Sequence, residues 1–561
     1  MMFPATLSSS FIIAFSLWHC VGPATALPTF KSPSLLDISI TELGALLEAG
    51  DFNSHDLVEL YIQRVREVND DLRAVIELNP DALSIAKQLD KERADGTIRG
   101  PLHGIPILVK DNYATVDAMM TGAGSVCLAR TRPSEEATAI AKLRKAGAVV
   151  LGKANLSEFA GIRGDGAKVG WSPRGGQTYG AYVKHQTACG SSSGSGVAAS
   201  VGLAAGTLGT ETAGSITCPA MVGNVVGIKP TVGLTSRYGI VPITARQDTA
   251  GPLAQSVEDA AIIMDAIAGK DLNDNYTSAQ PWDVPPSFAA ALDTSALRGA
   301  RIGVIWTDEN FLNAGNFANL NYTKPVFKRA LADLKAAGAE IIDVDLSNNG
   351  HTIGEFSMWV YGNISTYMSP DVVDSMARYL KSAVPNPDAM HNVSDIFQCL
   401  KTEPKELASK YGIDDWEHIA QINTTADSLE AWEAYVTAST MARDLLLNPI
   451  KDHKLDALVM QPELALVVAA SPGLPIVTVP MGVLGQDAST IWDHDEEILF
   501  SAPGVPLGIS FTAGMWSDQK LIRYAYAYEQ ISRNRRKLVP AIKPKSDLDV
   551  IMGRQSFSNE L

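Results

Sequence analysis

One lysine and two serines have the residue types and surroundings to carry chemistry. Lys110 ends an apolar run, IPILVK, and Ser191 and Ser215 lie 24 residues apart in two glycine-rich turns. A serine hydroxyl becomes a nucleophile when a base removes its proton. A lysine can be that base if burial lowers its pKa from about 10.4, because only the neutral amine accepts a proton. The three residues therefore predict a nucleophile, a relay and a base that attack an acyl carbon without a histidine.

The glycines before the two serines also have a physical use. Gly190 would relieve crowding before Ser191, and Gly214 would allow a tight turn whose backbone N–H groups converge on one oxygen. A competing interpretation uses the same segment. The letters GSSSG at 190–194 match the nucleophile elbow of α/β-hydrolases, with Ser192 as nucleophile. That interpretation needs a strong strand before the motif and a histidine motif after it, and the sequence offers neither.

The segment 189–220, with Lys110 in the letters VKDN, resembles the amidase signature family of serine hydrolases. The resemblance covers about residues 36–530 and is less clear near 270–450. Its sequence motifs are most similar to those of the peptide amidases and related secreted amidases. Further matching segments are GGQT at 175–178, GIKPT at 227–231, QDTAGP at 247–252, TVPMG at 478–482 and 504–511.

The resemblance implies roles at particular positions. Ser215 matches the nucleophile, Ser191 the relay serine, which follows a cis peptide bond in this family, and Lys110 the base. Ala160 and Gly190 are the expected substrate contacts. The expected oxyanion hole consists of the backbone N–H groups of Thr212, Ala213, Gly214 and Ser215. The resemblance implies no metal and no organic cofactor.

Three positions depart from the family pattern. Ala213 stands where many members have glycine, and alanine tolerates positive φ less well, so a differently shaped oxyanion loop is expected. Glu211 stands where aspartate is frequent, and Thr217 where arginine is common. A supporting ion pair between those last two positions is therefore absent. None of these changes removes a predicted catalytic group.

The resemblance implies hydrolysis of a linear carboxamide C–N bond through an acyl-enzyme, with C-terminal peptide amides as substrates. Fatty-acid amides, small aliphatic or aryl amides and esters stay open as alternatives, as does a catalytically silent secreted binding protein. The partner is thus a peptide or small-molecule amide. The net charge of −16 argues against nucleic acid, which needs clustered basic residues. The oligomeric state is left open.

The N-terminal segment predicts secretion. Residues 11–21 are apolar and residues 24–26 are small, so residues 1–26 are read as a signal peptide, with no membrane span after its removal. Four cysteines then remain, Cys127, Cys189, Cys218 and Cys399, as disulfides or free thiols with the pairing open. Asn155 adjoins the site and is not expected to carry sugar. The candidate N-glycosylation sites are Asn275, Asn321, Asn363, Asn392 and Asn423.

The elements that must position the lysine and serines follow from the apolar pattern. From Gly100 onward, short apolar runs alternate with helical spacers, which predicts an α/β fold: a large mixed β-sheet covered by helices on both faces. Residues 27–561 are expected to form a single domain. Strands are predicted at 105–109, 148–151, 225–228, 299–306, 340–344, 457–460, 476–480 and 507–511. Helices are predicted within 36–95, at 137–146 and 324–337, and through residue 528, with a helical cap at 350–450.

Three further parts of the sequence are expected to have structural roles. Asp248 is expected to be a structural turn or hinge residue. The acidic run 493–497 is expected to be a solvated loop, with a metal role as the minor alternative. The basic run 533–537 is expected to be a solvated helix end.

Overall fold

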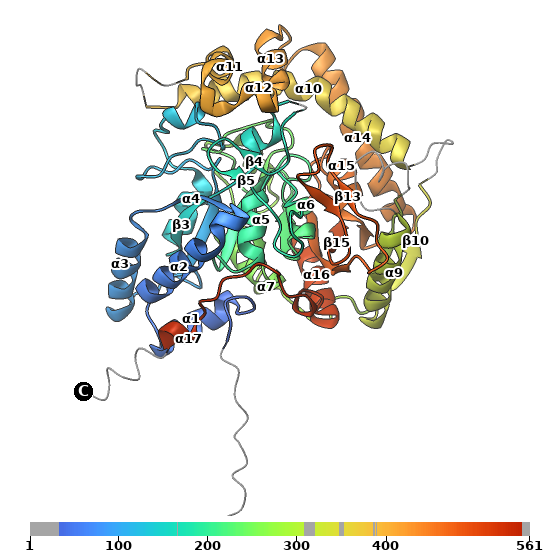
Figure 1. The fold of residues 1–561 in the computed structure, drawn as a ribbon. Helices are drawn as coiled ribbons and strands as arrows, with labels where there is room; N and C mark the ends of the chain where they lie inside the picture. Colours follow the sequence, from blue (N-terminus) through green and yellow to red (C-terminus); the bar gives the residue numbers. More distant parts are fainter. Residues whose placement is uncertain are drawn as a thin grey trace, which may run out of the picture.

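The computed structural model describes residues 33–164, 166–307, 320–346, 353–384, 388 and 390–552. The predicted signal peptide lies outside the described residues. Eleven strands form one mixed sheet in the middle of the molecule, with helices around it (Figure 1). In spatial order they are β1 (Val75–Leu78), β3 (Val149–Ala154), β2 (Pro106–Lys110), β6 (Gly206–Glu211), β8 (Thr249–Ala254), β7 (Val226–Lys229), β12 (Ile476–Val483), β15 (Pro506–Thr512), β11 (Ala457–Met460), β9 (Arg301–Val304) and β10 (Glu340–Asp343).

The sheet combines parallel and antiparallel pairs, as predicted. Strand β2 runs parallel to both β3 and β6. Strands β8, β7, β12 and β15 continue the sheet in antiparallel pairs, and β11, β9 and β10 are parallel again. All residues of β2 are buried, as expected for a strand covered on both faces. Lys110, the last residue of β2, is therefore held in the interior.

Helices cover both faces of the sheet. Neighbouring residues of a strand point to opposite faces, so Gly206 and Gly209 of β6 face opposite ways. A Cβ on Gly206 would meet Ile263 of α7 (Val257–Ile267), and one on Gly209 would meet Ser192, the residue before α5 (Ser193–Ser200). Helix α5 and α6 (Thr217–Val222) thus lie on the face that carries the serines.

The remaining helices form a flank and an outer layer. Helix α2 begins at Ser54 and is capped by Asn53, whose side chain accepts the Asp56 N–H. A layer of α10 to α14 lies over one end of the molecule (Figure 1). The helices are α1 (Ile40–Ala49), α2 (Ser54–Leu72), α3 (Ala82–Ala94), α4 (Thr138–Lys145), α9 (Leu320–Ala336), α10 (Ile353–Lys381), α11 (Val393–Thr402), α12 (Ala408–Tyr411), α13 (Asp414–Gln421), α14 (Leu429–Asp452), α15 (Pro462–Val468), α16 (Asp518–Ser532) and α17 (Asp549–Met552).

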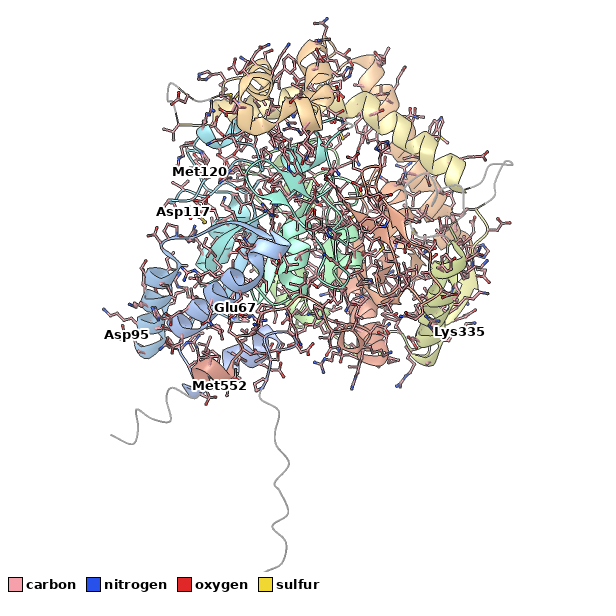
Figure 2. The ribbon with its side chains drawn as sticks, in the orientation of Figure 1. Glu67, Asp95, Asp117, Met120, Lys335 and Met552 are labelled. Atoms are coloured by element: carbon pink, nitrogen blue, oxygen red, sulfur yellow. A yellow bond between two sulfur atoms is a disulfide. The ribbon has the colours of Figure 1, made fainter. Side chains whose placement is uncertain are left out.

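The two ends of the described chain meet at the surface below the sheet. Asp547 accepts hydrogen bonds from Ser34 Oγ and from the Leu35 N–H. The segment before it crosses α2, where Glu67 accepts the Lys545 N–H at 2.6 Å; Figure 2 shows Glu67 on the same side as Met552. Among the described residues, no helix is long and apolar enough to cross a bilayer.

The basic run after α16 differs from its predicted role. Arg535 is partly buried, and its guanidinium donates to the carbonyls of Asn224, Leu36 and Ser200. This arginine therefore joins distant segments of the chain, whereas Arg536 and Lys537 are exposed as expected.

Candidate active site

The structure brings Lys110, Ser191 and Ser215 into one hydrogen-bonded chain. Lys110 Nζ donates to Ser191 Oγ at 2.8 Å, and Ser191 Oγ donates to Ser215 Oγ at 2.8 Å. The peptide bond between Gly190 and Ser191 is cis. Ser191 is 3% exposed and Ser215 7%, so the third member of the chain keeps the most contact with the exterior. The order of exposure fits a base inside, a relay between and a nucleophile outside.

Other oxygens surround the lysine amine. Lys110 Nζ lies 3.0 Å from Ser192 Oγ, 2.9 Å from Thr210 Oγ1 and 3.3 Å from the Thr210 carbonyl oxygen. A neutral amine has two N–H bonds and one lone pair. If its N–H bonds point to Ser192 and Thr210, the lone pair is left for Ser191. Sequence reasoning did not find Thr210, because no motif marks a threonine near the end of a buried strand.

Ser192 itself is not placed to be a nucleophile. Its side chain is fully buried. The Ser192 hydroxyl donates to the Thr210 carbonyl at 3.1 Å and accepts the Thr210 N–H at 3.2 Å. Both contacts fasten the serine to strand β6. The geometry therefore disfavours the α/β-hydrolase interpretation of this segment.

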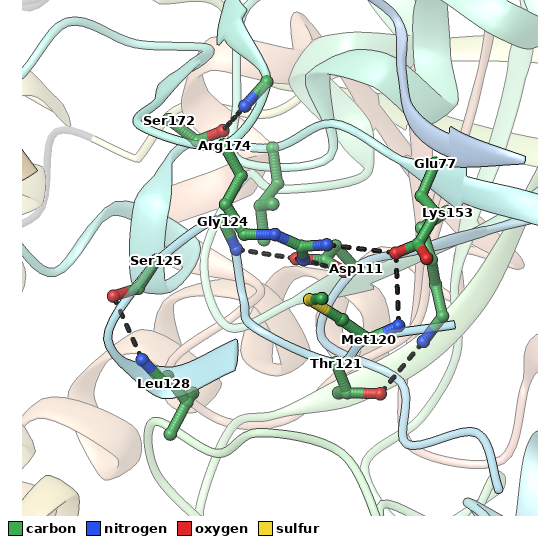
Figure 3. Close-up of polar contacts among 12 residues, drawn as sticks. Glu77, Asp111, Met120, Thr121, Gly124, Ser125, Leu128, Lys153, Ser172 and Arg174 are labelled. Atoms are coloured by element: carbon green, nitrogen blue, oxygen red, sulfur yellow. Dashed lines mark hydrogen bonds and ion pairs between the residues drawn. The ribbon is translucent and has the colours of Figure 1, made fainter. Parts of the chain in front are cut away.

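Burial sets the pKa of Lys110. Removal from water lowers this pKa to about 7, although the negative charges of Glu211 and Asp248 act in the opposite direction. Asp111, the next residue, does not add to them, because it turns toward Arg174. Arg174 lies 2.7 Å from Asp111 and 3.0 Å from Glu77 (Figure 3). The arginine neutralises the carboxylate nearest to Lys110 in sequence.

Two other lysines are as deeply buried as Lys110. Burial lowers the pKa of Lys153 and that of Lys229 to about 8. Lys153 Nζ donates to the Tyr113 carbonyl and to Thr121 Oγ1, and Lys229 Nζ donates to the Pro230 and Leu474 carbonyls. None of these hydrogen bonds is made to a serine hydroxyl. Geometry, rather than a lowered pKa, therefore singles out Lys110.

The Glu211 carboxylate organises the turn that carries Ser215. It accepts the N–H groups of Gly214 (2.9 Å), Ile216 (2.7 Å) and Thr217 (2.8 Å), and also the Thr217 hydroxyl (3.3 Å). These contacts take the place of the ion pair that the family pattern has between positions 211 and 217. They also occupy the Gly214 N–H, so this member of the predicted oxyanion hole is not available.

Three carbonyl groups of this turn accept hydrogen bonds from neighbouring groups of the protein. The Glu211 carbonyl accepts from Thr249 Oγ1, the Thr212 carbonyl from Gln247 Nε2, and the Gly214 carbonyl from the Cys218 N–H. In a trans peptide the N–H points opposite to the carbonyl. The N–H groups that follow these carbonyls belong to Thr212, Ala213 and Ser215, and they make no hydrogen bond within the described part of the protein. They are the N–H groups left to bind an oxyanion.

Ala213 does not adopt the positive φ that its side chain would disfavour. The residue with positive φ in this turn is Gly214, at +82°, and Ala213 is not among the positive-φ residues. The expected distortion by Ala213 therefore has no basis in its backbone conformation.

The four cysteines form two disulfides, which settles the pairing that the sequence left open. Cys189 bonds to Cys218, and Cys127 bonds to Cys399. Cys189 directly precedes Gly190, and Cys218 follows Ser215 by one helical turn. The Ser192 N–H also donates to the Ser215 carbonyl at 3.1 Å. The two serine-bearing turns are therefore joined by a covalent bond and by a backbone hydrogen bond.

Of the expected substrate contacts, Gly190 directly precedes Ser191, and Ala160 lies three residues after Ser157, whose N–H donates to the Ser191 carbonyl. Gly190 and Ala160 are each partly buried. A Cβ at Gly190 would lie 2.4 Å from Ser157 Oγ, so only glycine fits there. Ala160 has positive φ, at +58°, in a turn next to Phe159. Phe159 packs against Trp416 of α13 at 4.6 Å between ring centroids, which ties this turn to the helical layer.

The asparagines of the sequons differ in accessibility. Asn275, Asn321, Asn392 and Asn423 are exposed, whereas Asn363 is partly buried. Asn155 is fully buried, and its Nδ2 donates to the Arg73 and Gly176 carbonyls and to Thr178 Oγ1. Asn155 is thus inaccessible, while glycosylation of the other five stays a prediction.

The acidic run 493–497 is more than a solvated loop. Lys168 Nζ lies 3.0 Å from Asp493, 3.2 Å from Asp495 and 2.6 Å from Glu497. The lysine thereby occupies the space between the three carboxylates. Within the described ranges, no group of three or more histidine, cysteine, aspartate or glutamate side chains could hold a metal ion.

Comparisons with known proteins agree with the geometry. The Amidase family model matches residues 56–522. A protein of Arthroderma benhamiae that bears the name "Putative amidase" is 41% identical over 527 residues, covering 93% of this chain and 86% of the relative. The crystal structure of native peptide amidase from Stenotrophomonas maltophilia is 38% identical, with a TM-score of 0.77 over 90% of this chain and 98% of that one. A structure of the peptide amidase in complex with the competitive inhibitor chymostatin has the same identity and TM-score.

Proposed function

This chain belongs to the amidase family, and from that premise we propose that it hydrolyses the C-terminal carboxamide of peptides and releases ammonia. The observation that carries the proposal is the hydrogen-bonded chain from Lys110 Nζ through Ser191 Oγ to Ser215 Oγ. The likeness to peptide amidase supports the substrate class.

The reaction begins with neutral Lys110. In that state the hydrogen bonds reverse, so Ser215 donates to Ser191 and Ser191 donates to the lysine amine. Ser215 Oγ attacks the carbonyl carbon while its proton passes to Ser191 and the Ser191 proton passes to Lys110. The carbonyl electrons move to oxygen, which the N–H groups of Thr212, Ala213 and Ser215 stabilise.

The intermediate then collapses and the C–N bond breaks. The proton held by Lys110 returns through Ser191 to the leaving nitrogen, which departs as ammonia. Water attacks the acyl-enzyme and gives its proton to the same relay, and Ser215 recovers a proton as the C–O bond breaks. One amide and one water thus give one carboxylic acid and one ammonia, and Lys110 ends neutral as it began.

The test is ammonia release from a panel of amides. The panel contains several peptide amides, a long-chain fatty amide and a small aliphatic amide. Ser215→Ala is the inactive variant. Ser195→Ala is its matched control, because the Ser195 hydroxyl is also buried but donates to the Leu208 carbonyl rather than to a member of the Lys110–Ser191–Ser215 chain. We expect peptide amides to release ammonia with wild type and Ser195→Ala but not with Ser215→Ala.

The other outcomes revise the proposal in different ways. Release from only the fatty or the aliphatic amide would keep the mechanism and change the substrate class. No release from any amide, with no labelling of Ser215 by a serine-reactive probe, would favour a non-catalytic binding protein. Loss of activity in Ser192→Ala with full activity in Ser215→Ala would contradict the assignment of the nucleophile.

We also propose that the enzyme is secreted and glycosylated. Disulfides persist in oxidising compartments. The two disulfides and the predicted signal peptide support export, and four exposed sequons support glycosylation. A mass loss on treatment of the exported protein with an N-glycosidase is the expected result, and an unchanged mass would contradict it.

A further inference from the structure

The loop 243–248 holds the turn that carries the nucleophile. Gln247 Nε2 donates to the Thr212 carbonyl at 3.2 Å, and Thr212 Oγ1 donates to Asp248 at 2.7 Å. The other oxygen of Asp248 accepts two backbone N–H groups of its own loop, so the expected turn role is present and is combined with a contact to the oxyanion loop. The loop thus forms hydrogen bonds with both the backbone and the side chain of Thr212.

The same loop is held on its other side by the outer helical layer. Tyr367 of α10 donates its phenol hydrogen to Gln247 Oε1. One helical turn further along α10, Asp371 accepts from Arg246 Nε at 3.0 Å. The Arg246 guanidinium also lies 4.7 Å from the ring centroid of Tyr435 on α14. Helices α10 and α14 therefore contact the nucleophile turn through one intervening loop.

The contact at Thr212 fixes the direction of one N–H group. The Thr212 carbonyl and the Ala213 N–H belong to the same planar peptide and point in opposite directions. Gln247 holds the carbonyl, so the Ala213 N–H is directed away from loop 243–248. We propose that Gln247 and Tyr367 are positioning residues, through which the helical layer orients the Thr212–Ala213 peptide for binding the oxyanion. The inference rests on the proposed function, because it concerns the same reaction.

Tyr367 decides which end of the Gln247 amide meets Thr212. Gln247 and Tyr367 are both fully buried. A phenol that donates to Oε1 leaves the NH2 end for the Thr212 carbonyl, and a reversed amide would set two carbonyl oxygens against each other. The phenol hydroxyl thereby maintains the donor that holds the peptide plane.

The experiment compares two variants with two matched controls. Gln247→Met removes the donor to Thr212, and its control is Gln280→Met, because Gln280 Nε2 donates to the Gly233 and Leu234 carbonyls elsewhere in the interior. Tyr367→Phe removes one hydroxyl, and its control is Tyr435→Phe, the neighbouring ring at 5.5 Å between centroids. Tyr367→Phe carries the test if Gln247→Met does not fold.

The readouts separate positioning from a general loss of structure. We measure kcat and KM for a peptide amide, affinity for a peptide aldehyde that forms a tetrahedral adduct, and affinity for the peptide acid product. Removing an oxyanion donor outright costs about 100- to 1000-fold in kcat, so misorienting one should cost about 10- to 100-fold. We expect aldehyde affinity to fall by the same factor, with KM and product affinity within about twofold of wild type. The acid limb of the pH profile should stay in place, because the proton relay is untouched.

Each outcome decides a different claim. A loss of kcat and aldehyde affinity in Gln247→Met and Tyr367→Phe, with neither control affected, supports the inference. Unchanged kcat, or an equal loss in Gln280→Met and Tyr435→Phe, overturns it while the proposed function stands. If wild type hydrolyses no amide of the panel, the proposed function fails, and this inference fails with it.

Discussion

At the scale of single residues, the protonation of Lys110 controls the proposed chemistry. Burial lowers the pKa of the amine and the charges of Glu211 and Asp248 raise it, which together leave it at about 7. A lysine with the pKa of a free side chain would be protonated at nearly all physiological pH values and could not accept the Ser191 proton. The buried site therefore keeps a large fraction of the lysine ready as a base near neutral pH.

The pKa of Lys110 predicts the pH dependence of the enzyme. Below about 7 the amine is protonated in the free enzyme, so kcat/KM should rise about tenfold per pH unit, and above 7 it should level off. Initial rates on a peptide amide between pH 5 and 9 measure this limb. A profile that is flat from pH 5 to 7 would contradict the assignment of Lys110 as base.

The Glu211→Gln variant tests the direction in which the Glu211 charge shifts the pKa of Lys110. Removing a negative charge makes the ammonium form less stable, so the pKa of Lys110 should fall and the acid limb should move to lower pH. The maximal kcat should also fall, because a neutral amide cannot replace a carboxylate that accepts hydrogen bonds from Gly214, Ile216 and Thr217. A limb that moves to higher pH would contradict the argument.

The sequence predicted the three residues of the candidate site, but not the residues that hold them in position. Lys110, Ser191 and Ser215 have motifs around them, and the structure brings these three together. Thr210 and Gln247 act through positions that only the folded chain defines: Gln247 reaches Thr212 across 35 residues of sequence. The occupied Gly214 N–H was also not foreseeable, because it depends on the reach of the Glu211 side chain.

At the scale of elements, the least predictable strand is β6, which lies in the interior of the sheet between β2 and β8. All eight predicted strands are present within a few residues of their expected bounds, whereas β1, β6 and the β6 partner β8 were not predicted. Strand β6 reads GTLGTE, which lacks the β-branched apolar residues, valine and isoleucine, that are typical of buried strands. The reason is close packing: a Cβ on Gly206 would lie 2.3 Å from Ile263, and one on Gly209 would lie 2.7 Å from Leu253.

This packing predicts the effect of a single methyl group. Gly209→Ala places a Cβ 2.8 Å from Ser192 Oγ, so Ser192 must move, and with it one of the oxygens around Lys110. We expect a loss of about 1–3 kcal/mol in the free energy of unfolding and a lower kcat. Denaturant unfolding and rates on a peptide amide measure both.

The matched control for that change lies in helix α1. A Cβ on Gly44 would meet nothing within 4 Å, so Gly44→Ala should be neutral or stabilise by up to about 1 kcal/mol. Equal stability and activity of Gly209→Ala and Gly44→Ala would show that β6 tolerates a side chain, contrary to this argument.

At the scale of the whole molecule, the two disulfides connect different parts of the structure. Cys127 and Cys399 join the core to helix α11 of the outer layer, whereas Cys189 and Cys218 join the two serine-bearing turns. We expect removal of either bond, by paired Cys→Ser changes, to lower the free energy of unfolding by about 2–4 kcal/mol. Only the change at 189 and 218 should also lower kcat well below the melting temperature, because it frees the turns that hold Ser191 and Ser215.

The comparison of the two variants provides its own control. Urea unfolding gives the stability change for each, and ammonia release from a peptide amide gives kcat. An equal effect of both changes on kcat would mean that the Cys189–Cys218 bond has no special relation to the site.

The nesting of the two disulfides has a consequence for the order in which the chain matures. Cys189 and Cys218 are 29 residues apart, and both lie between Cys127 and Cys399, which are 272 residues apart. Loop-closure entropy alone makes the inner ring close about 30-fold more readily than the outer one. Once it has closed, Cys127 and Cys399 have only each other as partners among the four cysteines that the structure describes. Early closure of the Cys189–Cys218 bond thus also favours correct oxidation, because it removes both of the mispaired alternatives among these four cysteines.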